Sequence, residues 1–303
     1  MQFSSGTARF HLPCLFEFYD FYKRFLPLFF VHRDFFYEWA DIASIYGCPD
    51  GCLWAGGRFE NSSAGVKDVL SLVNGCGISA RLTFSNSLLQ EPHLADKTCN
   101  RLCERFQQSG ASVQNGVIVH SDLLLEYLEK NYPGLYFVSS TTKVLTSFEA
   151  FRAELQRDDF RFVVPDFRLN KQFERLQALP QVLKDKVEFL CNECCWTGCT
   201  ERSLCYQNVS ARILGMEHLE HQCHAPGGRD GYRFSKAMKN PAFIGICDIV
   251  QTYLPMGFSN FKIEGRGLGS ALLLEFLLYY LTKPEHQIEV REALYLDCML
   301  DLF

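Results

Sequence analysis

Short apolar segments rich in strand-forming residues recur along the chain, and most are followed by a stretch with a helical pattern. Strands that alternate with helices form βαβ units, whose parallel strands lie side by side in one sheet. This alternation restricts the fold more than any other feature. The expected strands are Pro13–Phe16, Ile42–Tyr46, Ile78–Phe84, Gly116–His120, Leu135–Ser139, Phe160–Pro165, Val187–Cys191 and Phe258–Glu264. The expected helices include Ala64–Asn74, Leu94–Gln108, Ser121–Asn131, Ser147–Gln156, Lys171–Leu179 and Ser270–Tyr280.

Eight parallel strands are the number that closes a (β/α)8 barrel, so we predict an α/β fold of the TIM-like type. A chain of 303 residues is long enough for one such barrel or for two modest domains. No linker rich in Pro, Gly or Ser divides it, which favours a single domain over residues 1–303 with a Cys-rich insertion at about 191–247. The count of eight strands is weakest at the first expected strand and in the stretch between Cys205 and Phe258.

The composition narrows the class of protein. Hydrophobic residues make up 48% of the chain and aromatic residues 14%, which is enough for a large packed core and unlike a disordered protein. The net charge of −5 argues against a broadly basic surface that binds nucleic acid. A local basic rim would still leave RNA open as a substrate.

Neither an export signal nor a membrane segment is expected. Met1–Phe10 lacks the basic region, apolar stretch and small-residue cleavage site of a signal peptide. The aromatic run Leu12–Val31 is the most membrane-like part, but a spanning helix rarely tolerates its charged residues, which are Glu17, Asp20, Lys23 and Arg24. We therefore expect a cytoplasmic protein in a reducing compartment.

Polar or reactive residues stand at the ends of several expected strands. Active sites of parallel barrels are built at the C-terminal ends of the strands, so these residues are candidates for one shared site. They are Cys48, Asn86, His120 with Ser121, Asp166, the cysteines from Cys191 onward, and Glu264 with Arg266. We expect Glu264, Arg266 and His120 to position a substrate; Glu264 and Arg266 could equally pair with each other.

Cysteines are concentrated behind the seventh expected strand. Leu190–Tyr206 reads L-C-N-E-C-C-W-T-G-C-T-E-R-S-L-C-Y, and Cys223 follows beside three histidines, His218, His221 and His224. Thiols this dense in a chain without an export signal indicate a metal or iron–sulfur site rather than disulfides.

The spacing leaves the ligand set open. Cys195 and Cys199 stand at C-x-x-x-C spacing, and Cys205 and Cys223 are near enough in sequence to join them. Iron–sulfur clusters are usually held by four thiolates, whereas structural zinc takes paired Cys or Cys/His ligands, of which a second pair is missing here. The alternative is that these are buried cysteines behaving as small apolar residues.

A second pair, Cys48 and Cys52, has the same spacing at the end of the second expected strand. It could supply a fourth ligand or form a redox couple. The favoured interpretation is that both cysteines simply flank a turn made by Pro49, Asp50 and Gly51.

The segment F-S-N-F-K-I-E-G-R at Phe258–Arg266, preceded by the helix-like Cys247–Gly257, resembles the end of the collagenase-like peptidase family U-32. The resemblance covers about Val187–Tyr280. It implies a barrel-like fold and similarity to oxygen-independent hydroxylation factors, which act on ubiquinone precursors or RNA bases and hold a 4Fe–4S cluster; other members are termed peptidases. It also implies ligands, namely Cys195, Cys199 and Cys223, with Cys205 as the first choice for the fourth and Cys191 or Cys52 as alternatives.

The cysteine density and this resemblance together predict an iron–sulfur protein with a 4Fe–4S cluster at the C-terminal mouth of the barrel. Its expected function is that of a redox enzyme, or a partner subunit of the same family, that hydroxylates a small organic or RNA substrate. The alternatives are a peptidase-like hydrolase with structural zinc and a non-catalytic interaction protein whose metal only stabilises the fold.

Overall fold

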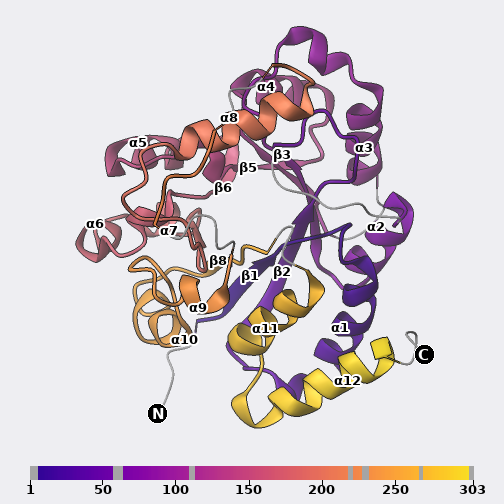
Figure 1. Ribbon diagram of the computed structural model, residues 1–303, viewed down its shortest axis with the longest axis vertical. Coiled ribbons are helices and arrows are strands. Elements are labelled where there is room, and N and C mark those ends of the chain that lie inside the picture. Colours follow the sequence, from indigo (N-terminus) through magenta and orange to yellow (C-terminus); the bar gives the residue numbers. More distant parts are fainter. Residues whose placement is uncertain are drawn as a thin grey trace.

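The computed structural model describes residues 6–56, 64–108, 113–217, 221–226, 232–265 and 269–299. Their strands form one parallel sheet in the order β6-β5-β4-β3-β2-β1-β8-β7. A parallel bridge between Val163 and Val187 joins the two edge strands, so the sheet closes into a barrel (Figure 1). The strands are β1 (Ala8–Leu12), β2 (Ala40–Gly47), β3 (Ser79–Phe84), β4 (Gly116–Val119), β5 (Tyr136–Ser139), β6 (Phe160–Val163), β7 (Glu188–Leu190) and β8 (Asn260–Lys262).

Helices alternate with the strands and surround the barrel (Figure 1). They are α1 (Tyr19–Val31), α2 (Val66–Gly75), α3 (Lys97–Gln107), α4 (Asp122–Asn131), α5 (Phe148–Leu155), α6 (Phe173–Gln177), α7 (Gln181–Lys184), α8 (Arg202–Ile213), α9 (Phe234–Ala237), α10 (Ile246–Asp248), α11 (Ser270–Leu281) and α12 (Gln287–Met299). Short 3-10 turns follow several strands, including η2 (Glu91–Ala95), η3 (Thr141–Lys143) and η4 (Phe167–Leu169). The predicted (β/α)8 architecture is confirmed.

The first expected strand is wrong, whereas each of the others overlaps an observed strand. Pro13–Phe16 lies directly after β1. Pro13 has no N–H to donate to a neighbouring strand, and Cys14 adopts a positive φ of 70°, which a strand residue does not adopt. Chain pairing therefore ends at Leu12.

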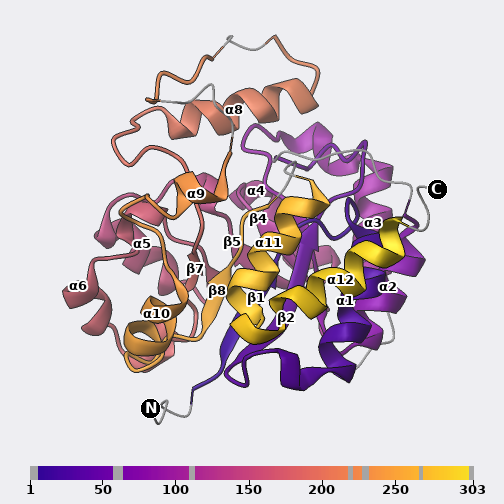
Figure 2. The same ribbon diagram turned by 60° about the horizontal axis from the view of Figure 1, so that its bottom comes forward.

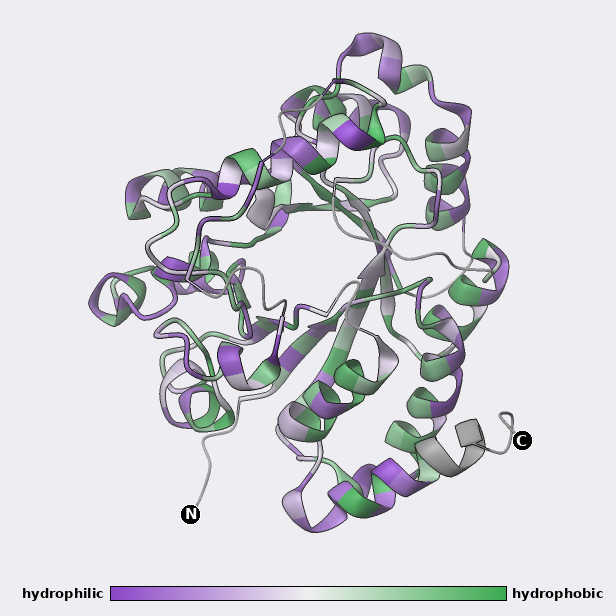
Figure 3. Ribbon diagram, in the orientation of Figure 1, coloured by the Kyte–Doolittle hydropathy of each residue, from purple (hydrophilic) through white to green (hydrophobic). Residues whose placement is uncertain are grey.

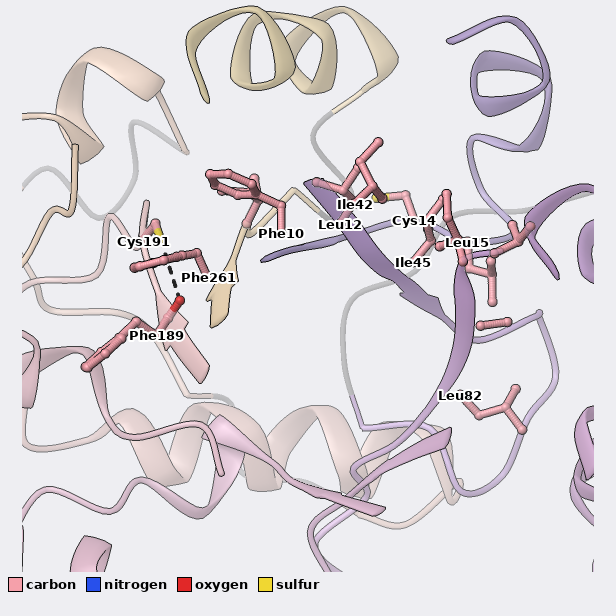
Figure 4. Close-up of a cluster of buried hydrophobic side chains, with 14 of the residues drawn as sticks. Phe10, Leu12, Cys14, Leu15, Ile42, Ile45, Leu82, Phe189, Cys191 and Phe261 are labelled. Atoms are coloured by element: carbon pink, nitrogen blue, oxygen red, sulfur yellow. Dashed lines mark hydrogen bonds between the residues drawn. The ribbon is translucent and has the colours of Figure 1, made fainter. Parts of the chain in front are cut away.

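The main hydrophobic core lies between the barrel and its helices. Phe10, Leu12, Ile42 and Ile45 contribute from β1 and β2 (Figure 4). Helix α11 is largely apolar, and most of its leucines and aromatic residues are buried, as expected of a helix packed onto the barrel; Figure 3 shows its hydrophobic segments in green. None of the described helices is long and apolar enough to cross a membrane.

A second, smaller apolar cluster contains six residues from five strand regions and lies inside the barrel. Its members are Tyr46, Ile118, Tyr136, Val138, Val164 and Leu190. Side chains alternate between the two faces of a strand, so these five strands contribute both to this cluster and to the outer core between the barrel and its helices. The interior is filled rather than hollow.

Charged residues complete the filling of the barrel. Glu188 of β7 accepts hydrogen bonds from Arg81 of β3 at 2.5 Å and from Lys262 of β8 at 3.2 Å, and His11 of β1 lies 3.5 Å away. Burial alone would raise the pKa of Glu188, but the charge of Arg81 above all holds that pKa well below its usual range. Burial, together with Arg81, lowers the pKa of His11 to about 3, so this histidine is neutral at pH 7.

The insertion after β7 crosses the C-terminal mouth of the barrel. Figure 2 shows α8 and the segment that follows it above one end of the barrel. Ser210 of α8 accepts a hydrogen bond from the Ser87 backbone N–H at 3.0 Å, just beyond β3, and α8 also contacts η3, just beyond β5. The Cys-rich loop 191–201 is therefore held beside the strand ends, where barrel enzymes place their active sites.

Candidate functional site

The base of the candidate site is an ion pair that follows β6. Asp166 is fully buried and caps η4 by accepting a hydrogen bond from the backbone N–H of Arg168. The Arg168 guanidinium also binds this carboxylate, through Nε at 2.6 Å and Nη2 at 3.0 Å. Its Nη1 donates to the carbonyl of Cys199 at 2.6 Å. Arg168 thus ties the Cys-rich loop to the end of β6.

Glu193 and Arg202 form a second ion pair inside the same loop. Glu193 accepts from the backbone N–H of Cys195 at 2.9 Å and from Arg202 Nη2 at 2.8 Å. Burial opposes ionisation of Glu193, but the charge of Arg202 and these hydrogen bonds outweigh it and lower the pKa of the carboxyl. The backbone of Cys195 is therefore held in place by an ionised side chain.

The Arg202 side chain has unused donors. Arg202 is only 4% exposed, and its guanidinium lies over the aromatic rings of Phe167 and Tyr206. The Tyr206 hydroxyl accepts a hydrogen bond from Arg202 Nη2 at 2.8 Å. Nε lies 3.8 Å from Asp166, too far for a hydrogen bond, and neither Nε nor Nη1 has a hydrogen-bond partner among the described residues. Buried N–H groups of a cation without protein acceptors are uncommon, and in proteins such groups are satisfied by a bound anion or by water.

One thiol of the expected ligand set, that of Cys195, lies near this guanidinium, and two more lie near Cys195. Burial raises the pKa of Cys195 to about 12, the charge of Arg202 acts in the opposite direction, and Cys199 and Cys205 raise the pKa further. These charge effects act only over short range, so Cys195 lies near Arg202, Cys199 and Cys205. All three thiols are partly exposed.

The other expected cluster ligands lie elsewhere. Cys223 is exposed. Cys191 is fully buried, belongs to the outer core and directs its thiol to the carbonyl of Phe189 (Figure 4). Cys52 is also in the outer core, where its Sγ lies 2.9 Å from that of Cys99.

Glu264 is joined to the loop through its backbone. Asn192 accepts from the Glu264 N–H at 2.7 Å and donates to the Glu264 carbonyl at 2.9 Å, and Tyr232 donates its hydroxyl to the Asn192 carbonyl. This arrangement fixes the end of β8 against the end of β7. Arg266 lies outside the described residues, and so does His218.

His120 follows β4 on the side of the mouth that α8 covers. Its Nδ1 shares a 2.9 Å hydrogen bond with the hydroxyl of Thr142 in η3, which contacts α8. Burial, with help from Lys143, lowers the pKa of His120 to about 4. The imidazole is neutral at pH 7 and can both accept and donate a hydrogen bond there.

The described part of the chain contains no group of three or more His, Cys, Asp or Glu side chains arranged to hold a metal ion. The donor chemistry of the loop nevertheless suits a soft metal, because it offers several thiols beside buried positive charge. Sequence reasoning noted Asp166 but missed Arg168, Glu193 and Arg202, although R-x-x-x-Y at Arg202–Tyr206 already placed a cation one helical turn from an aromatic ring.

Comparisons with known proteins bear on the fold alone. No model of a protein family matches the chain, and no curated protein matches it. Among solved structures, the chain is similar to that of the U32 peptidase Mk0906, with 16% sequence identity and a TM-score of 0.50, over 88% of this chain and 95% of that one. The U-32 resemblance seen in the sequence is thus matched by a shared fold.

Proposed function

We propose that this chain binds an iron–sulfur cluster through Cys195, Cys199 and Cys205 at the C-terminal mouth of its barrel. One observation carries the proposal: Cys195 lies near Cys199, near Cys205 of α8 and near the buried guanidinium of Arg202, which has two N–H groups without acceptors among the described residues. Thiolates that bind a metal are negatively charged, so they would supply the acceptors that Arg202 lacks. The fourth ligand would be Cys223 or an external group.

The thiols would have to move closer together on binding, because the described residues do not already form a group arranged for a metal. The ion pairs Arg168–Asp166 and Arg202–Glu193 hold the backbone at the Cys199 carbonyl and the Cys195 N–H, so at these two cysteines the movement would fall mainly to the side chains. A cluster bound here would supply one-electron transfer.

Substrate binding is proposed at the same mouth. Neutral His120 would offer a hydrogen bond, and Glu264 a carboxylate, to a small organic or RNA substrate that undergoes hydroxylation. The hydrogen bonds between the Asn192 side-chain amide and the Glu264 backbone hold Glu264 in register with the Cys-rich loop, so substrate and metal would be positioned by one rigid unit.

The test is the metal content of protein purified without oxygen. We expect a brown protein with about four iron and four sulfide per chain if a 4Fe–4S cluster is bound. Cys195→Ser, Cys199→Ser and Cys205→Ser should each lose most of the iron. Cys76→Ser is the matched control, because Cys76 is a partly exposed thiol at the end of α2 and should leave the iron unchanged.

The alternative functions give different results in the same experiment. A colourless protein with one zinc per chain would favour a hydrolase or interaction protein with structural zinc. Iron that persists in all three cysteine variants would refute the ligand assignment. A protein that contains neither iron nor zinc would refute the proposal as a whole.

A further inference from the structure

A buried pair of thiols lies away from the Cys-rich loop. Cys52, in the loop after β2, and Cys99, in the first turn of α3, are 2% and 0% exposed, and their sulfur atoms are 2.9 Å apart. A disulfide bond is about 2 Å long, so the two sulfurs need to approach by only about 1 Å to bond. The residues are 47 positions apart in sequence, which means that tertiary packing alone brings them together.

Packing on both sides holds the pair in place. The indole of Trp54 donates to the carbonyl of His93 at 2.7 Å, and the Asn86 N–H donates to the carbonyl of Trp54. On the other side, the backbone N–H of Cys99 donates to Asp96, which caps α3. The loop that carries Cys52 and the helix turn that carries Cys99 are thus each held in place by hydrogen bonds.

A third thiol connects this pair with solvent. Cys48 lies four residues before Cys52, is partly exposed, and has its side chain near that of Cys52. Burial raises the pKa of Cys52, and the hydrogen bond from Cys52 is the main cause that raises the pKa of Cys99. Both buried thiols should therefore react slowly with an external disulfide. The accessible thiol of Cys48 beside them can react first and pass the oxidation on to them.

We propose that Cys52 and Cys99 form a redox-active dithiol that is oxidised by low-molecular-weight disulfides through Cys48. The Cys48 thiolate attacks the external disulfide RSSR, forms the mixed disulfide Cys48–SR and releases one RSH. Cys52 then attacks the Cys48 sulfur and displaces the second RSH. Cys99 finally attacks Cys52, which yields the Cys52–Cys99 disulfide and returns Cys48 to the thiol. Two thiols lose two electrons and two protons, and RSSR takes up both to become two RSH.

Oxidation would join the loop after β2 covalently to α3. This loop also carries Trp54 and Leu53, whose carbonyls bind Asn86, and Asn86 donates to the Ser210 carbonyl in α8. The dithiol is therefore connected through two hydrogen bonds with the helix that covers the barrel mouth. The inference does not depend on a metal in the Cys-rich loop.

The experiment equilibrates the full chain with mixtures of reduced and oxidised glutathione, traps free thiols with iodoacetamide, and maps disulfides by mass spectrometry without reduction. We expect one crosslinked pair of peptides, containing Cys52 and Cys99, in protein whose circular dichroism is unchanged. The oxidised form should melt higher by about 5 °C, because the disulfide restricts the unfolded chain. The rate at which the Cys52–Cys99 disulfide forms should increase with pH, since the reacting thiols must deprotonate.

Three variants separate the roles of the cysteines. Cys103→Ser, one turn further along α3, is the matched control and should leave the crosslink unchanged. Cys48→Ser should slow its formation severalfold while leaving its final yield unchanged. Cys99→Ser should end in a Cys48–Cys52 disulfide or a glutathione adduct. A wild-type chain in which Cys52 and Cys99 both stay reduced until it unfolds, or in which another pair crosslinks, would overturn the proposal.

Discussion

Arg81 and Glu188 meet inside the barrel, where Arg81 Nη1 donates a 2.5 Å hydrogen bond to Glu188 Oε2. They come from β3 and β7 and are separated by 107 positions in sequence. Both side chains are almost completely buried. Lys262 shares the same carboxylate, and its ammonium lies 3.6 Å from the centre of the Tyr46 ring. One carboxylate therefore joins three strands through the interior.

Replacing Glu188 with Gln should destabilise the protein by about 3–5 kcal/mol, because two buried cations would lose their counter-charge. Urea unfolding followed by circular dichroism measures this change. The matched control is Glu149→Gln, which removes an exposed ion pair with Arg175 and should cost less than about 1 kcal/mol. Equal effects of the two substitutions would contradict the role assigned to Glu188.

Acid should destabilise the protein through His11. An unfolded histidine titrates with a pKa near 6.5, whereas burial in the barrel lowers the pKa of His11 to about 3. Between these values the unfolded state binds the extra proton, so the free energy of unfolding falls as the pH falls, by up to about 1.4 kcal/mol per pH unit.

The effect is best measured between pH 6.5 and 4.5, where carboxylates contribute least. His11→Asn keeps a polar group near the hydroxyl of Ser44, with which Nδ1 shares a 2.8 Å hydrogen bond, and cannot titrate. The variant should therefore show a shallower decline of stability with acidification, whatever its stability at neutral pH. An unchanged slope would show that His11 does not resist protonation.

The loop after β2 passes so close to the end of β3 that only glycine fits at position 56. A Cβ on Gly56 would lie 2.1 Å from the Ser85 carbonyl oxygen and 2.4 Å from the Asn86 nitrogen, and backbone atoms cannot move aside cheaply. Gly56→Ala should cost more than about 2 kcal/mol in thermal or urea unfolding. Gly75→Ala, at the end of α2 with open space around it, should be neutral or stabilise by about 0.5 kcal/mol.

Arg202 should control the order of the Cys-rich loop. Arg202→Gln leaves the mostly buried carboxylate of Glu193 without its cation, which should cost about 3 kcal/mol. Hydrogen exchange should increase in residues 193–213 before it increases in the strands. Arg175→Gln, which affects an exposed pair far from the loop in sequence, serves as the control and should leave the exchange pattern unchanged.

Much of the barrel could be predicted because its strands are short apolar runs between turns. The first strand, Ala8–Leu12, was not predicted because its sequence A-R-F-H-L mixes charged and apolar residues, and a more apolar run follows it after Pro13. That mixture is itself informative: Arg9 is exposed, while His11 faces the interior. Charges inside the runs V-E-F-L and A-R-L-T-F were the available signal for an internal ion pair, since a buried charge in a parallel strand requires a partner.

The candidate site could be predicted only in part. Local spacing identified the loop with Cys195 and Cys199, because their concentration is visible in one short segment. The partner of Cys52 could not be identified, because Cys99 stands in a helix 47 positions away. Sequence spacing likewise gives no sign that Arg202 has unpaired donors, which only three-dimensional packing determines.

The central claim is that Cys195, Cys199 and Cys205 bind iron together at the barrel mouth. X-ray absorption at the iron edge of anaerobically purified protein tests it most directly. We predict iron surrounded predominantly by sulfur, with a second shell of neighbouring iron, and loss of that signal in Cys199→Ser but not in Cys76→Ser. Iron surrounded by nitrogen and oxygen, or the full sulfur signal in Cys199→Ser, would contradict it.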